Sequence, residues 1–107
     1  MGPLVWIAML HVKPTGNESV LAAGTTGAYT NVVALANGVS EFEEKIRNEI
    51  RGHGLDLLEL EDAEPFDQWA ATHDVSAELY ELVESVKNSP HVGFDAFYSY
   101  DRDDEVQ

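Results

Sequence analysis

The sequence predicts an α+β domain, in which a four-stranded mixed sheet carries two main helices on one face. Two observations predict it. Short apolar stretches with β-favouring residues alternate with two segments whose apolar residues recur at helical spacing. The order along the chain is β-β-α-β-α-β, which is typical of an α+β sandwich. A chain of 107 residues fits one such domain, and we expect residues 1–100 to form it and the charged residues 101–107 to fray.

The first two strands are expected to form a hairpin. Residues 3–12 are apolar on both faces when they are read with the two-residue period of a strand, which indicates a central strand or a sheet covered on both faces. Residues 28–36 place larger apolar side chains on one face and mostly alanines on the other, where a helix can pack closely. The segment between them, residues 13–27, is expected to be a long loop.

The clearest helix follows over residues 40–51. Ser40 is expected to cap its N-terminus, with Glu43 three residues later completing a capping box. An apolar stripe recurs every four residues and should face the sheet. It consists of Phe42, Ile46 and Ile50.

Residues 55–62 are expected to form the third strand. Leu55 and Leu57 alternate in one phase and Leu58 and Leu60 in the opposite phase, a pattern that a β-bulge would explain. Together with the strand and helix before it, this strand should form a β-α-β unit with parallel strands, which makes the predicted sheet mixed.

The second half of the chain predicts a helical turn at residues 65–69, an amphipathic helix over 76–88 and a last strand over 91–100. Ser76 or Asp74 can cap the second helix. The last strand is expected to place five side chains on one face: Val92, Phe94, Ala96, Tyr98 and Tyr100. With both main helices on one side, the layers are similar to those of ferredoxin-like folds, although the leading hairpin departs from the usual β-α-β-β-α-β order of that family.

The net charge of −14 is unevenly distributed. Residues 54–84 carry ten acids and no Lys or Arg, whereas residues 1–40 are neutral. Such a field repels nucleic acids and anionic membranes and favours a basic protein partner, although solubility or adaptation to salt would produce the same composition. The sequence therefore predicts a small, non-enzymatic interaction domain that engages a basic partner. Its candidate surface consists of Asp56, Glu59, Glu61, Asp62, Glu64 and Asp67.

The sheet face that the helices would leave open is also apolar. Its candidate residues are Ile7, Met9, Tyr29, Val33 and Leu35. An exposed apolar patch of this kind often marks an interface, so a homodimer packed sheet to sheet is expected. Alternatively, the loop over residues 13–27 folds across this face.

No pattern of residues predicts a catalytic, metal or cofactor site. The chain has no cysteine, and its four histidines lack the spacing of a zinc pair. The alternative function is a small ligand-binding or catalytic α+β dimer, with its pocket between sheet and helices and residues 13–27 as a lid. Because the apolar N-terminal run is too short to span a bilayer and lacks the features of a signal peptide, a cytoplasmic location is expected.

Overall fold

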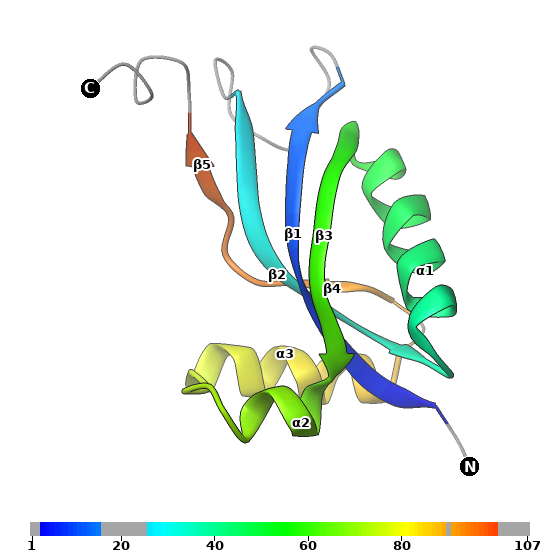
Figure 1. The fold of residues 1–107 in the computed structure, drawn as a ribbon, viewed down its shortest axis with the longest axis vertical. Helices are drawn as coiled ribbons and strands as arrows, with labels where there is room; N and C mark the ends of the chain where they lie inside the picture. The colour runs from blue at the N-terminus through cyan, green and yellow to red at the C-terminus, as the bar shows by residue number, and fades with distance from the viewer. Residues whose placement is uncertain (1–2, 16–25, 90, 101–107) are drawn as a thin grey trace.

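The computed structural model describes residues 3–15, 26–89 and 91–100. Within these residues, five strands form one antiparallel sheet and three helices pack on it, so the predicted α+β class is confirmed (Figure 1). The predicted tail and most of the predicted loop lie outside the described residues. No helix in this part of the chain is long and apolar enough to cross a membrane.

A central hairpin organises the sheet. β1 (Leu4–Pro14) pairs with β2 (Gly27–Ala36), β3 (Leu55–Pro65) lies beside β1, and β4 (Gly93–Phe94) and β5 (Tyr98–Tyr100) lie beside β2. All four pairings are antiparallel. The predicted mixed, four-stranded sheet is therefore wrong. β2 and β3 do run parallel, as a β-α-β unit requires, but β1 lies between them and pairs with both, so no two neighbouring strands of the described sheet are parallel.

Helices cover both faces of the sheet. α1 (Val39–Gly52) packs on the face that carries the small side chains of β2, and its predicted apolar stripe is buried there. α2 (Phe66–Ala70) and α3 (Ala77–Lys87) pack on the opposite face, at the end of the sheet where β1 begins (Figure 1). The prediction of two main helices on one face is therefore wrong, and the ferredoxin-like layers are not confirmed. The physical reason is that β1 is apolar on both faces, so each face needs a cover.

The two longer helices begin differently. α1 has no side-chain cap, because the helix already begins at Val39, so the capping box predicted at Ser40 is wrong. α3 is capped as predicted: the hydroxyl oxygen of Ser76 accepts a hydrogen bond of 3.1 Å from the backbone N–H of Leu79. Ser40 and Ser76 look alike in sequence, but only Ser76 accepts a hydrogen bond from a free backbone N–H group at the start of its helix.

Two register shifts bend the pairing of β3 with β1. The first lies beside Leu58 and the second beside Asp62, whose φ of 58° is unusual for a residue other than glycine. The phase change that the leucines predicted is therefore confirmed. Its effect is that Leu57 and Leu60, which lie on either side of the first shift, both pack on the α1 side of the sheet.

The last strand is interrupted. Phe94 of β4 pairs with Val32, and Tyr98 of β5 pairs with Tyr29, so three residues of this strand oppose two of β2. The extra residue reverses the alternation of faces. Phe94 packs on the α1 side, whereas Tyr98 and Tyr100 lie on the opposite side with Tyr29. The predicted continuous strand with one shared face is therefore wrong.

Candidate interaction site

The six carboxylates predicted as an interaction surface follow the edge strand β3 and the first turn of α2. They form the acidic strand surface: Asp56, Glu59, Glu61, Asp62, Glu64 and Asp67. Five of them are exposed, and Glu64 is half-buried. Among the described residues, none of the six makes an ion pair, and the nearest Lys or Arg on the described strands is Lys13, which lies opposite Asp56 without pairing with it. Within the described residues, no ion pair therefore compensates the acids of β3, whereas Lys87 acts electrostatically on Asp67, and Arg47 and Arg51 line a hollow together with Asp56.

Glu59 and Glu61 point to the same face of the sheet. The register places Glu59 opposite His11 and Glu61 opposite Met9. The neighbouring Glu59 raises the pKa of Glu61 above its usual value of 4.5, first through a hydrogen bond between the two carboxyl groups and then through repulsion of like charges. Like charges on Glu59 and Glu61 repel each other, so a cation placed near them is attracted by both.

A row of aromatic side chains continues this surface across the sheet. His11 lies opposite Glu59 on one side and opposite Tyr29 on the other, and Tyr29 in turn lies opposite Tyr98. The rings of His11 and Tyr29 stack, with their centroids 4.1 Å apart and their planes 12° apart. The hydroxyl of Tyr100 lies 2.7 Å from Nε2 of His11 and completes the group. We call these four residues, His11, Tyr29, Tyr98 and Tyr100, the aromatic platform.

Gly27 makes room for this arrangement. It is the register partner of Tyr100, and a Cβ atom at Gly27 would lie 2.5 Å from the hydroxyl oxygen of Tyr100 and 2.7 Å from its Cζ atom. The tyrosine ring therefore crosses β2 over a residue without a side chain and so reaches His11. Even so, the platform remains open to solvent: the exposed fraction is 73% for Tyr98 and 41% for Tyr29.

The five residues predicted as a dimer face are divided by α2 and α3. These residues are Ile7, Met9, Tyr29, Val33 and Leu35. Ile7 and Val33 are fully buried beneath the two helices, and Leu35 is half-buried there. Met9 and Tyr29 lie beyond the helices and are exposed. The expectation that this whole face lacks a cover within the chain is therefore corrected, and pairing of two copies stays a prediction.

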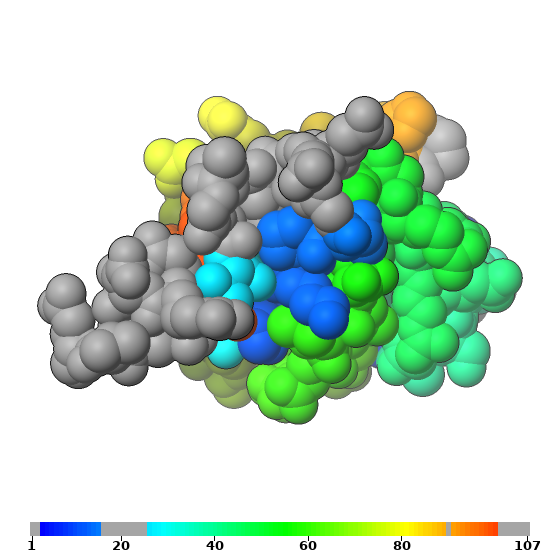
Figure 2. Space-filling view, turned by 90° about the horizontal axis from the view of Figure 1, so that it is seen from above, coloured from blue at the N-terminus to red at the C-terminus, as the bar shows by residue number. Residues whose placement is uncertain are grey.

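The platform and the first acids of the acidic strand surface, Asp56 and Glu59, lie toward the end of the molecule where β1 ends and β2 and β3 begin. Seen from that end, atoms of the three strands lie next to one another (Figure 2). The predicted lid connects β1 to β2 at this same end. Its residues 16–25 lie outside the described residues.

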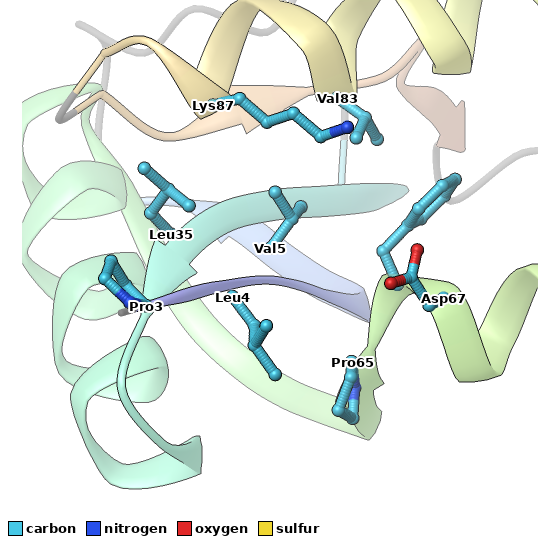
Figure 3. A pocket seen from close by; sticks show the side chains of 9 residues that line it. Pro3, Leu4, Val5, Leu35, Pro65, Asp67, Val83 and Lys87 are labelled. Carbon is cyan, nitrogen blue, oxygen red and sulfur yellow. The ribbon is translucent and has the colours of Figure 1, made fainter. Parts of the chain in front are cut away.

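A cavity of about 290 Å³ lies at the opposite end of β1, between the sheet and α2 and α3 (Figure 3). Its walls are mostly apolar, with side chains such as Val5 and Val83, and two charged residues, Asp67 and Lys87, also line it. A hydrogen bond with Glu84 at 2.9 Å raises the pKa of Lys87. Because the eleven residues of β1 rise about 3.3 Å each, the cavity and the ends of the predicted lid are separated by the length of the sheet.

Histidines and acids do not gather into a metal site in the described part of the chain: no group of three or more residues of these types has metal-binding geometry. His53 instead lies 3.3 Å from a carboxylate oxygen of Glu49, and the ring of His73 stacks on Trp69 with centroids 4.3 Å apart. These contacts give both histidines a local structural role.

Sequence reasoning found the acidic strand surface but missed the aromatic platform. It assigned Tyr98 and Tyr100 to one face with Phe94, because an unbroken strand alternates regularly. The signal that could have helped is Gly27, a residue without a side chain that begins a strand opposite a large aromatic residue.

No protein-family model matches the chain, and neither the curated proteins nor the solved structures give a significant match.

Proposed function

We propose that this domain binds a basic protein partner through the acidic strand surface, as a non-enzymatic interaction module. The observation that carries the proposal is a run of six carboxylates along β3 and the start of α2, none of which forms an ion pair with a described residue. A cationic side chain placed between Glu59 and Glu61 would be attracted to both carboxylates and would offset their mutual repulsion. Charge complementarity of this kind also accelerates association and disfavours acidic competitors. We place this binding in the cytoplasm. The chain has no cysteine, so its fold does not depend on disulfides, which a reducing compartment would not maintain.

Titration calorimetry with a short peptide in which lysine alternates with serine tests the proposal. Binding should weaken strongly between ionic strengths of about 0.05 M and about 0.3 M, because salt screens exposed charges beyond a Debye length of about 10 Å at 0.1 M. Salt dependence alone would also follow from the net charge. The location of the charges must therefore be tested separately.

A matched pair of double variants locates the binding surface. Glu59→Gln/Glu61→Gln removes two charges from β3, and Glu43→Gln/Glu44→Gln removes two from α1, on the other side of the sheet. Exposed ion pairs are individually weak, so the first variant should weaken binding about fivefold and the second much less. Equal losses in the two variants would show that net charge, and not this surface, attracts the peptide, and would contradict the proposal.

A second candidate function, binding of a small ligand, is favoured by the cavity of Figure 3. Apolar walls beside the ammonium group of Lys87 suit a small apolar acid. Thermal-shift measurements with short-chain carboxylates should show stabilisation of the unmodified protein and a smaller effect for Lys87→Gln. An equal effect in both proteins would contradict a role of this cavity in recognising the carboxylate.

A further inference from the structure

We infer that the basic partner is recognised through an arginine side chain, whose guanidinium group stacks on the face of the His11 imidazole that Tyr29 leaves uncovered and donates hydrogen bonds to Glu59 and Glu61. This inference rests on the proposed function and deepens it, because it names the side chain that the surface selects. The aromatic platform supplies the stacking surface, and the acidic strand surface supplies the charge.

The register brings the two parts of this site within reach of one side chain. Glu59, His11 and Tyr29 occupy one cross-strand row, and neighbouring strands lie about 4.8 Å apart. A guanidinium group against the imidazole of His11 is therefore about one strand spacing from Glu59. Glu61 follows two residues later on the same face, opposite Met9, and borders the same position. Two carboxylates thus lie on one side of the stacked rings.

This combination fits arginine better than lysine. The guanidinium group is planar and weakly hydrated, and it presents several N–H donors in a fixed geometry, so it can stack on a ring and bond to carboxylates at the same time. A lysine ammonium group is compact and strongly hydrated, so it would be attracted mainly by the charge of the carboxylates and would gain little from the rings. Stacking on the imidazole adds to the attraction of the two carboxylates for the guanidinium group. The aromatic platform should therefore convert an unselective acidic surface into one that prefers arginine.

A second copy of this chain fits this face less well than a basic partner does. Each copy would bring Glu59 and Glu61 to the interface, whereas the described strands offer Lys13 as their single basic side chain. With a net charge of −14 per chain, two copies repel each other, and a basic partner does not meet this cost. Charge complementarity therefore points to a partner of opposite charge.

The test compares two short peptides, in which either arginine or lysine alternates with serine, at an ionic strength of about 0.15 M. We expect the arginine peptide to bind about fivefold more tightly, which corresponds to about 1 kcal/mol. Tyr29→Leu should bring the ratio of the two affinities close to one. Tyr80→Leu is the matched control, because Tyr80 is also an exposed tyrosine but lies on α3. It should leave the ratio unchanged.

Nuclear magnetic resonance supplies a readout of position. Cross-peaks between the arginine δ-methylene protons of the bound peptide and the ring protons of His11 are expected. If Tyr29→Leu proves poorly folded by circular dichroism, Tyr98→Leu replaces it, because Tyr98 is 73% exposed and its removal opens no core. That variant should also lower the ratio, though by less.

The outcomes separate the inference from the proposed function. If both peptides bind equally and Glu59→Gln/Glu61→Gln weakens both, the acidic strand surface binds cations and the arginine inference is overturned. If neither peptide shows binding that depends on these two glutamates, the proposed function fails and the inference fails with it. A dimer in light scattering that dissociates in Tyr29→Leu would assign the platform to a second copy and would also overturn the inference.

Discussion

Thr30 connects the core of the fold to the aromatic platform. Its side chain is 1% exposed, and its hydroxyl group donates a hydrogen bond of 2.9 Å to the backbone carbonyl oxygen of Asp95. The backbone N–H of Asp95 in turn donates to the carbonyl oxygen of Asn31 at 2.9 Å. These two bonds hold the interrupted segment between β4 and β5 against β2. Because that interruption reverses the alternation of faces, they also determine the side on which Tyr98 lies.

Replacing Thr30 by valine should therefore loosen β5 as well as destabilise the fold. Thr30→Val keeps the volume of the side chain but leaves a partly buried carbonyl group without its donor, at a cost of about 1–3 kcal/mol. The new methyl group is buried and returns about 0.8 kcal/mol, so the expected net loss is about 1 kcal/mol. Urea unfolding measures this loss, and amide hydrogen exchange measures opening of β5.

The matched control is Thr30→Ser, which keeps the hydroxyl group and removes a methyl group. It should cost a similar free energy of unfolding, about 1 kcal/mol, without faster exchange of the β5 amides. The comparison therefore separates the hydrogen bond from general destabilisation. If Thr30→Val leaves exchange in β5 no faster than Thr30→Ser does, the hydrogen bond does not hold this segment and the reasoning is refuted.

Three further perturbations have defined outcomes. Gly27→Ala places a methyl group 2.5 Å from the hydroxyl oxygen of Tyr100, so it should displace that ring. The displacement should lower the free energy of unfolding in urea by about 1 kcal/mol and shift the tyrosine ring resonances. Unchanged resonances would contradict the close approach. Because the pKa of Glu61 is raised in the folded state, its stabilising contribution is present below its usual pKa of 4.5 and is lost as the pH rises through the raised value. Glu61→Gln should therefore raise the melting temperature at pH 7 more than at about pH 3. An equal change at the two pH values would refute the assignment. Ser76→Ala should cost about 1 kcal/mol through loss of the α3 cap, whereas Ser40→Ala should cost little, and a reversed order would contradict the observed helix starts.

Local patterns predicted the elements of this fold well. The stripe of Phe42, Ile46 and Ile50 identified α1, because side chains four residues apart share one face of a helix whatever the rest of the chain does. Ser76 marked the start of α3 for the same kind of local reason. The reversed phase of the leucines in β3 identified a bulge, because alternation in a strand has a fixed period of two.

Arrangements that depend on distant parts of the chain were not predictable in the same way. The apolar character of both faces of β1 indicated that two faces could be covered, but it did not say which helix covers which face. The parallel direction of β2 and β3 followed from the helix between them, whereas the insertion of β1 between these strands did not. The aromatic platform was missed for the same reason, because the face of Tyr98 depends on a contact between Thr30 and Asp95, which are 65 residues apart.

The acidic residues of β3 also serve the edge of the sheet. An edge strand exposes unpaired backbone groups, and charges and bulges both discourage another strand from pairing with it. For protection alone, however, it would not matter on which face of the strand the charges lie. The first register shift does more than bend the edge: without it, Glu59 would lie on the α1 side with Leu57, and Leu60 would leave the core. With it, Leu60 is retained on the core side while Glu59 and Glu61 both turn toward the aromatic platform. This arrangement brings two carboxylates to the same side as four aromatic rings, and in that position they support the proposed recognition of a cation in addition to the protection of the edge.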